Sequence, residues 1–281
     1  VASRGLGDVY KRQYMNLSIK NISKTYGNDV QALKNVSLEI GNGMFGLLGP
    51  NGAGKSTLMR TIAALQDADT GSITIGGIDV STDKQALREI LGYLPQEFGV
   101  YPKVSANDLL DHKAVMKVIP DSSKRKEAVE SILHQTNLWE AKDRKLGAYS
   151  GGMKQRFGIA QALLGDPKLI IVDEPTAGLD PMERNRFHNL LSEIGENVIV
   201  ILSTHIVDDV SDLCNYMAII LNGEVHLVGE PIQLIKRLDQ KVWKGLIEKS
   251  DLVEIEKEND VISSRLYLSL IHISEPTRRY A

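Results

Sequence analysis

The chain has 281 residues, with 33 Lys and Arg against 36 Asp and Glu, and 42% of its residues are hydrophobic. This hydrophobic fraction is enough to bury a core, so general disorder is excluded and one large or two modest globular domains are expected. The single cysteine, Cys214, excludes a disulfide scaffold and a multi-cysteine zinc site. A formal charge of −3 gives no reason to expect nucleic acid as a partner. The longest apolar runs, Leu169–Val172 and Val198–Leu202, have the length of strands and fall far below the roughly 20 residues of a spanning helix.

The two ends of the chain differ from the rest of it. Both contain segments, GDVYKRQ and SLIHISEPTRRYA, that resemble translated sequencing-adapter read-through. We therefore expect residues 1–14 and 267–281 to be non-native tails, with native disordered tails as the alternative. No N-terminal stretch has the charged and then apolar pattern of a secretory signal, which predicts a cytosolic protein.

Apolar periodicity and turn residues predict alternating strands and helices. The first half is expected to contain strands at Asn16–Ile19, Ala32–Ile40 and Met44–Leu48, a helix at Lys55–Leu65, a hairpin around Gly76–Gly77 and a mostly helical stretch over Asn107–Gln135. The second half is expected to contain a helix from Ser150 to Leu164, a strand at Lys168–Asp173, a helix from Pro181 to Ile194, a strand at Asn197–Ser203 and a hairpin around Asn222–Gly223. Continuous apolar strands that alternate with helices predict an α/β fold with a parallel sheet covered on both faces.

A glycine-rich loop lies between a predicted strand and a predicted helix. Its sequence, GPNGAGKS over 49–56, fits the pattern G-x-x-x-x-G-K-[ST]. The glycines let backbone N–H groups converge on phosphates, Lys55 reaches the β- and γ-phosphates, and Ser56 takes Mg²⁺. The nucleotide-binding residues expected here are Gly49, Pro50, Asn51, Gly52, Ala53, Gly54, Lys55, Ser56 and Thr57.

Two adjacent acids end the apolar strand at Leu169–Val172. Asp173 is expected to hold Mg²⁺, and Glu174, on the other side of the strand end, to polarise an attacking water. Alone, such a pair has a solvated turn as its alternative. Together with the phosphate loop it predicts a nucleoside triphosphatase.

The segment Ser150–Arg156, with the sequence SGGMKQR, decides the class of triphosphatase. It lies just upstream of the acidic strand, where ATP-binding cassette (ABC) ATPases have their LSGGQ signature, and the chain resembles that family over Met15–Leu238. The resemblance implies an α/β fold with a P-loop NTPase core, whose mixed and mainly parallel sheet is flanked by helices. It further implies an N-terminal antiparallel β subdomain and an α-helical subdomain inserted at about 97–150.

The resemblance also implies roles for residues outside the phosphate loop. Tyr26 matches the aromatic residue that stacks on adenine, and Gln96 matches the glutamine that links the γ-phosphate and Mg²⁺ to the helical subdomain. Asp180 matches the aspartate of the D-loop, which spans Ala177–Asp180, and His205 matches the switch histidine at the γ-phosphate. The expected catalytic residues are thus Glu174, His205 and Gln96, and the expected Mg²⁺ ligands are Ser56, Gln96 and Asp173.

The family binds ATP between two subunits, with the phosphate loop of one facing the signature of the other. The residues expected to contact ATP across that interface are Ser150, Gly151, Gly152 and Met153. Two positions depart from the family pattern, Tyr149 in place of leucine and Met153 in place of glutamine. Met153 cannot make the hydrogen bonds of glutamine, but we expect activity to survive because Ser150 and Gly152 are intact.

The resemblance implies a transporter subunit. Without a spanning helix of its own, the chain is expected to pair with a separate transmembrane permease subunit and a second ATP-binding subunit, as a homodimer or heterodimer. It would then be cytoplasmic and peripheral on the inner face of the cell membrane, with the permease contacting Gln96–Val104 and Ala106–Met116. The segment Glu97–Pro102 is similar to exporters of the ABC-2, antibiotic-resistance kind, which favours export of a drug, peptide or other small substrate.

Other functions stay open on the sequence alone. A soluble ABC ATPase acting in cofactor assembly or another non-transport role is the main alternative. A non-catalytic regulatory cassette is disfavoured, because Lys55, Asp173, Glu174 and His205 are all intact. Residues 15–238 are expected to form the ATPase domain, and 239–266 are expected to begin an accessory α+β segment.

Overall fold

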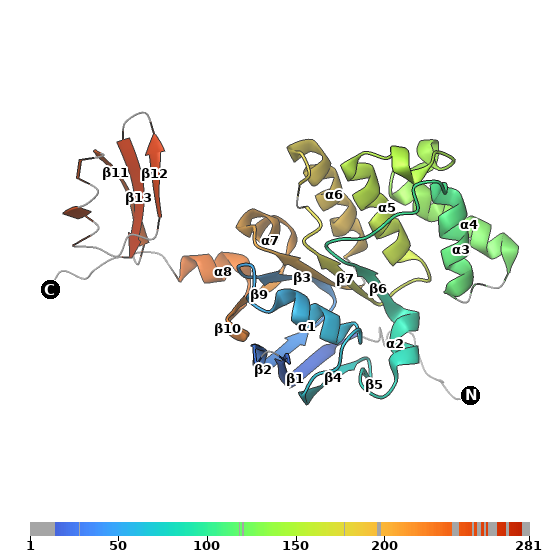
Figure 1. Cartoon of the computed structure of the whole chain (residues 1–281), viewed down its shortest axis with the longest axis horizontal. Coiled ribbons are helices and arrows are strands. Elements are labelled where there is room, and N and C mark those ends of the chain that lie inside the picture. Colours follow the sequence, from blue (N-terminus) through green and yellow to red (C-terminus); the bar gives the residue numbers. More distant parts are fainter. Residues whose placement is uncertain are drawn as a thin grey trace, which may run out of the picture. The chain divides into compact units, whose positions relative to one another are not determined.

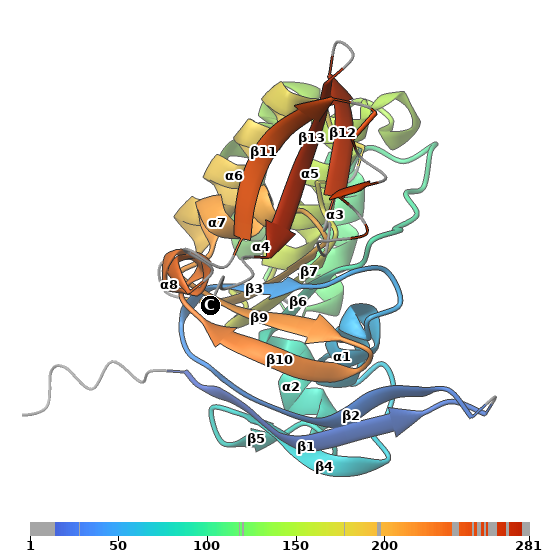
Figure 2. The same ribbon diagram turned by 90° about the vertical axis from the view of Figure 1, so that its left-hand side faces the viewer.

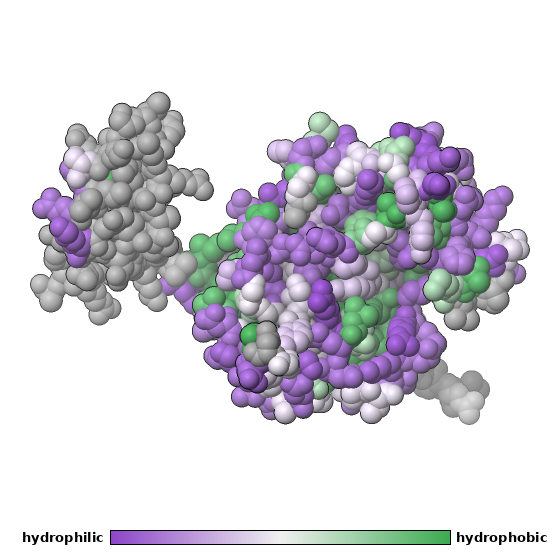
Figure 3. All heavy atoms as spheres, in the orientation of Figure 1, coloured by the Kyte–Doolittle hydropathy of each residue, from purple (hydrophilic) through white to green (hydrophobic). Residues whose placement is uncertain are grey.

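The computed structural model describes residues 15–27, 29–117, 119, 121–176, 178–195, 198–237, 242–248, 250–251, 254–255, 257, 263–267 and 270–276. The chain divides into two compact units, Val1–Gly229 and Glu230–Ala281, which are taken separately below. Among the described helices, none is both long enough and apolar enough to cross a membrane. The face of the first unit in Figure 3 is mostly hydrophilic, with its apolar residues in small separate groups.

An antiparallel sheet opens the first unit. Its strands follow the order β2-β1-β4-β5, with every neighbouring pair antiparallel, and they lie at the bottom of Figure 2. Their bounds are β1 Leu17–Thr25, β2 Gln31–Ile40, β4 Thr70–Ile75 and β5 Ile78–Asp79. This sheet confirms the expected N-terminal β subdomain.

A second sheet forms the centre of the unit. Its order is β10-β9-β3-β8-β7-β6, parallel from β9 to β6 and antiparallel only between β9 and β10. The strands are β3 Gly43–Leu48, β6 Leu91–Leu94, β7 Leu169–Asp173, β8 Ile199–Thr204, β9 Tyr216–Leu221 and β10 Glu224–Gly229. Every residue of β7 and β8 is buried, as their continuous apolar runs predict. The mixed, mainly parallel sheet is therefore confirmed.

Some helices of this unit pack against the two sheets, and the others form a separate cluster (Figure 1). Their bounds are α1 Lys55–Ile62, α2 Lys84–Ile90, α3 Ala106–Met116, α4 Ser122–Gln135, α5 Gly151–Leu163, α6 Pro181–Ile194 and α7 Val207–Leu213, with 3₁₀ turns at Trp139–Ala141 and Leu146–Ala148. Leu58 and Met59 of α1 are fully buried in one core with residues of both sheets, so α1 is packed between them. On the opposite face, a side chain at Gly46 of β3 would come within 2.6 Å of Val210 of α7. The close approach of α7 thus depends on a glycine in the central strand.

The inserted helical subdomain has its own core. Residues of α3, α4 and α5 are buried together, with Phe157 of α5 among the largest side chains fully enclosed. The mostly helical stretch expected over Asn107–Gln135 consists of two helices. The second begins because Asp121 accepts a hydrogen bond from the backbone N–H of Lys124 and so caps a new start.

Strand β6 is absent from the prediction, because four residues that include a glycine give no periodic signal. It pairs with β7 and packs against α5. A side chain at Gly92 of β6 would lie 2.2 Å from the backbone oxygen of Ala162 in α5. This strand leads directly into the loop that contains Gln96.

The second unit holds α8 Pro231–Lys236 and a three-stranded antiparallel sheet of order β11-β13-β12, made of β11 Val242–Glu248, β12 Ser263–Tyr267 and β13 Leu270–Pro276. The expected domain boundary at residue 238 thus differs from the division after Gly229 by one short helix. Strand β13 lies within residues 267–281, and the expectation that this segment is a non-native tail stays a prediction. Residues 1–14 and 277–281 lie outside the described residues.

Replacing Gly92 with alanine should destabilise the first unit. The added methyl group would collide with the carbonyl of Ala162, so β6 and α5 must separate, at a cost of about 1–3 kcal/mol in the free energy of unfolding. Denaturant titration of Gly92→Ala measures this loss. Gly41→Ala is the control, because nothing lies within 4 Å of its added carbon. Equal stability of the two variants would contradict the packing of β6 described above.

Candidate nucleotide-binding site

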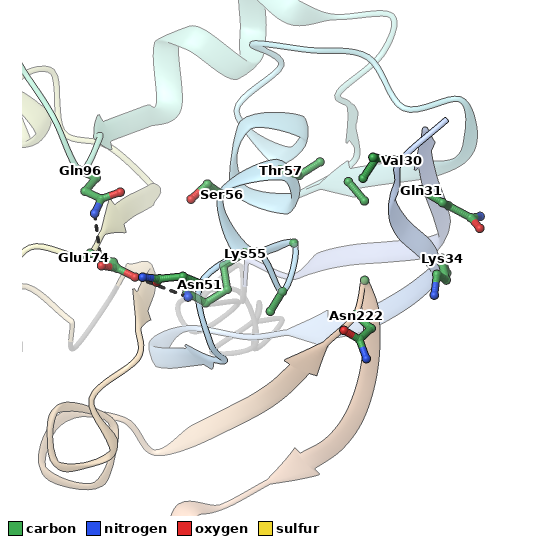
Figure 4. A pocket seen from close by; sticks show the side chains of 15 residues that line it. Val30, Gln31, Lys34, Asn51, Lys55, Ser56, Thr57, Gln96, Glu174 and Asn222 are labelled. Carbon is green, nitrogen blue, oxygen red and sulfur yellow. Dashed lines mark hydrogen bonds and ion pairs between the residues drawn. The ribbon is translucent and has the colours of Figure 1, made fainter. Parts of the chain in front are cut away.

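A cavity of about 720 Å³ lies at the carboxyl ends of the parallel strands, a size typical of small-molecule sites. Its walls come from the start of β2, the phosphate loop, the start of α1, the turn between β9 and β10, and two single residues, Gln96 and Glu174. Figure 4 shows these side chains around the opening, with Lys55, Gln96 and Glu174 grouped together on one side. The cavity collects all of the phosphate-loop residues from Asn51 to Thr57.

The phosphate loop owes its path to close backbone contacts. Gly54 has a φ of 107°, and a side chain there would lie 2.6 Å from the carbonyl oxygen of Ala32 in β2. A side chain at Gly49 would lie 2.3 Å from the carbonyl oxygen of Ile220 in β9. The loop is therefore pressed against both sheets, and the glycines of the motif have a packing role as well as a binding one.

Helix α1 begins without any side-chain cap. Its N-cap is Gly54, and no acidic residue occupies its first turn. The first N–H groups of a helix have no partner within the helix, and the aligned peptide dipoles give this end a partial positive charge. Ser56 and Thr57, in the first turn, line the cavity. This end of α1 is therefore suited to a phosphate group.

Lys55 is held inside the site by three oxygen atoms. Its side chain is 5% exposed, and Nζ donates hydrogen bonds to the carbonyl oxygens of Gly49 at 2.7 Å and Pro50 at 3.1 Å. Its third partner is Oε1 of Glu174, at 3.4 Å. A buried ammonium group needs such an anionic partner, and a phosphate in the cavity would compete with Glu174 for it.

Glu174 contacts the two other residues that are expected to be catalytic, His205 and Gln96. Its Oε1 lies 3.3 Å from Nδ1 of His205, and its Oε2 accepts a hydrogen bond of 3.3 Å from Nε2 of Gln96. The residue has a φ of 46°, which is unusual for a side chain other than glycine, and its N–H donates to the carbonyl of Ser203 in β8. Backbone strain of this kind persists only where the surroundings enforce it, and it is frequent at functional sites.

The oxygen atoms expected to hold Mg²⁺ fit that ion. Asp173 ends β7 with a buried carboxylate that accepts a hydrogen bond from the hydroxyl of Ser203. Ser56 and Gln96 offer a hydroxyl and an amide oxygen, which are hard donors of the kind that Mg²⁺ prefers. The described residues contain no group of three or more His, Cys, Asp or Glu side chains suited to a metal. The three donors would leave the remaining positions around Mg²⁺ to phosphates and water.

Tyr26 lies beside the cavity and is not part of its wall. Its hydroxyl donates a hydrogen bond of 3.1 Å to Oε1 of Gln66 and lies 3.3 Å from Oγ1 of Thr57, which does line the cavity. The ring is 39% exposed. Its stacking on adenine stays a prediction.

The signature residues form the start of α5. Ser150 is the N-cap, and its hydroxyl accepts a hydrogen bond of 3.2 Å from the N–H of Met153. A side chain at Gly152 would lie 2.4 Å from Oε2 of Glu183 in α6. None of the four signature residues lines the cavity, and neither does Asp180, which caps α6 by accepting from the N–H of Glu183 at 2.9 Å. These five residues are therefore not part of the cavity wall of their own chain.

The two departures from the family pattern contribute to packing. Tyr149 is buried in the core of the helical subdomain, where its hydroxyl donates to the carbonyl of Ala141 at 2.8 Å and its ring meets Phe157 edge-on. Met153 is partly buried against the same core.

Sequence reasoning missed part of the cavity wall. Lys34 of β2 and Asn222, in the turn between β9 and β10, both line the cavity. The turn itself was predicted, and φ values of 51° and 81° at Asn222 and Gly223 fit the expected hairpin. Its position beside the phosphate loop follows from the pairing of β9 with β3, which the sequence does not reveal.

Comparison with known proteins agrees with this geometry. Residues 33–177 match the ABC transporter family. The chain is 37% identical to the uncharacterized ABC transporter ATP-binding protein YxlF of Bacillus subtilis, over 89% of this chain and 83% of that protein. It is also 37% identical to the linearmycin resistance ATP-binding protein LnrL of the same organism, over 79% and 71%. Its fold matches the solved dimeric cassette MJ0796, in a post-hydrolysis state bound to ADP and phosphate, with a TM-score of 0.69 and 28% identity over 76% and 98%. The chain belongs to the ABC transporter family, as one of its ATP-binding and ATP-hydrolysing subunits.

Proposed function

We propose that the cavity described above binds ATP with Mg²⁺, and that Glu174, His205 and Gln96 hydrolyse it. The observation that supports this most directly is the meeting of Lys55, Glu174, His205 and Gln96 at one wall of the cavity, next to the uncapped start of α1. Asn51, Gly52 and Ala53 would surround the phosphates, with Gly49 and Pro50 supporting Lys55 from behind.

The contacts of Lys55 suggest how nucleotide and catalysis are linked. A phosphate bound at the start of α1 offers Lys55 a new anionic partner, which frees the carboxylate of Glu174 from its ion pair. Glu174 then has an oxygen available to take a proton from water, while His205 and Gln96 orient the reacting groups. Ser56, Asp173 and Gln96 would hold Mg²⁺, which neutralises charge that develops on the phosphates.

The signature residues are proposed to act in a second subunit. Ser150, Gly151, Gly152 and Met153 do not line the cavity of their own chain, and the similar cassette MJ0796 is a dimer. We infer that the start of α5 contacts ATP bound to the phosphate loop of a partner cassette, with Asp180 near the same interface. ATP then favours the closed dimer because it contacts both subunits only in that state.

The cassette is further proposed to dock on a separate transmembrane permease subunit, at the cytoplasmic face of the membrane. Exposed apolar side chains are present on the segments expected to receive it, with Tyr101 after Gln96 and Met116 at the end of α3, 65% and 72% exposed. The relative LnrL is a linearmycin resistance protein. We therefore infer that the direction of transport is export, and that the substrate is a drug, a peptide or another small molecule.

Replacing Lys55 with alanine should weaken ATP binding by roughly 10- to 100-fold, because a charge-assisted contact to phosphate is lost. Titration with a fluorescent ATP analogue measures the dissociation constant. Lys168→Ala serves as the control, since the side chain of Lys168 is 44% exposed and pairs with Asp166 in the loop that leads into β7. An unchanged dissociation constant in Lys55→Ala would contradict the proposal that ATP binds in this cavity.

Glu174→Gln should reduce ATP turnover by roughly 10²- to 10⁴-fold and leave ATP bound, because only the proton acceptor is lost. The variant should also shift from monomer to dimer with Mg-ATP, as measured by light scattering. Glu193→Gln, on the exposed side of α6, removes the same charge and should behave as the wild type. Full turnover by Glu174→Gln would exclude this residue as the base.

Gly151→Arg should block dimer closure and leave ATP binding by the monomer intact. Nothing lies within 4 Å of a carbon added at Gly151, so the fold and the Ser150 cap are kept while the surface becomes bulky and charged. Light scattering of the double variant Gly151→Arg/Glu174→Gln should show a monomer with and without Mg-ATP. A dimer that still forms would place the signature outside the interface.

A further inference from the structure

The first unit contains a completely buried carboxylate that none of the roles above uses. Asp209, in α7, has an exposed fraction of 0%. It receives contacts from four side chains that belong to three other segments of the chain. A buried charge with this many donors is satisfied, and it holds its donors in fixed positions.

One carboxylate oxygen holds the helix that follows the D-loop. Oδ1 of Asp209 lies 2.7 Å from Nε and 2.6 Å from Nη2 of Arg184, and 2.8 Å from Nε2 of His188. Both partners are in α6, which begins directly after its N-cap Asp180. The position of Asp180 is therefore tied to Asp209 through the first turns of α6.

The other oxygen holds the two segments that follow β7 and β8. Oδ2 accepts hydrogen bonds from the hydroxyls of Thr176 at 2.7 Å and Thr204 at 3.2 Å. Thr176 comes two residues after Glu174, and its carbonyl accepts from the N–H of Leu179 in the turn towards Asp180.

Thr204 extends this connection to both sides of His205. It is the last residue of β8 and directly precedes His205, and its hydroxyl also accepts a hydrogen bond of 3.0 Å from the N–H of Ile206. The backbone before and after His205 is thus fixed through one hydroxyl that Asp209 orients. The side chain of His205 itself is 47% exposed and has only Glu174 as a partner among the ion pairs of the described residues.

We propose that Asp209 is a positioning residue for ATP hydrolysis, which keeps His205 and the D-loop in register with Glu174. It does not line the cavity, so it acts on the geometry of the reacting groups and not on nucleotide affinity. Through it, a displacement of Asp180 at the dimer interface is transmitted by α6 to the turn that contains His205. This inference rests on the roles proposed above for Glu174 and His205.

Asp209→Asn tests the proposal, because it keeps the shape of the side chain and removes the negative charge that faces Arg184 and His188. We expect kcat to fall by about tenfold or more, with the dissociation constant for a fluorescent ATP analogue changed by less than about twofold. Asp208→Asn is the matched control, since this neighbour in the first turn of α7 is exposed and should keep the wild-type kcat. A wild-type kcat in Asp209→Asn would overturn the proposal.

A purely structural role predicts a different pattern. In a His205→Ala background, Asp209→Asn should leave the residual ATPase rate unchanged if it acts through His205, whereas a further fall of the same size as in the wild type would overturn the proposal. Thr204→Val removes the hydroxyl that connects Asp209 to Ile206 and leaves no unpaired charge buried. This variant tests the proposal if Asp209→Asn does not fold. Thr204→Val should lower kcat while ATP binding is kept, and an unchanged kcat would count against the inference. An inactive wild type, or an active Glu174→Gln, would instead contradict the proposed function itself.

Discussion

The contact between Lys55 and Glu174 is the interaction on which the site depends. It joins the phosphate loop to the end of β7, which are separated in sequence by the whole helical subdomain, and it places a buried cation beside the uncapped end of α1. A buried ammonium group and an uncapped helix start are both unfavourable unless an anion lies beside them. In the described structure that anion is the carboxylate of Glu174, and the group that replaces it, a nucleotide phosphate, would release the carboxylate for chemistry. Under the proposed function, the ion pair that a phosphate displaces is the same one that occupies the carboxylate of Glu174.

This dependence explains why the surrounding backbone is so constrained. Glu174 has a left-handed backbone conformation, and the loop glycines Gly49 and Gly54 are in contact with carbonyl oxygens from two different sheets. Each of these positions tolerates little movement, because interiors are close-packed and do not deform continuously. The site is therefore tightly held along the side formed by the phosphate loop and the end of β7.

The sequence predicted most strands of the central sheet and the phosphate-loop residues that line the cavity, for a physical reason. Strands such as β7 and β8 are buried on both faces and are apolar throughout, and the phosphate loop needs residue types that rarely occur together by chance. Strand β6 was missed because its four residues, Gly92 included, derive their conformation from contact with α5 and not from their own pattern. Asp209 was missed because an acid in the first turn of a helix ordinarily faces water, as its neighbour Asp208 does. Only the tertiary structure distinguishes the two.

The strand order of the central sheet has a consequence for synthesis of the chain. Strand β3, which leads into the phosphate loop, has β8 and β9 as its two neighbours, and the N–H of Gly223 after β9 donates to the carbonyl of Ala53 inside the loop. All of these partners leave the ribosome long after the loop itself. A nascent chain that ends before β8 therefore contains the complete phosphate-loop sequence without the strands that shape it, and such distant pairing slows folding. The phosphate loop therefore has all of its neighbouring strands only when nearly the whole first unit has been synthesised. We expect an unfinished cassette to lack a formed nucleotide site and so to hydrolyse no ATP.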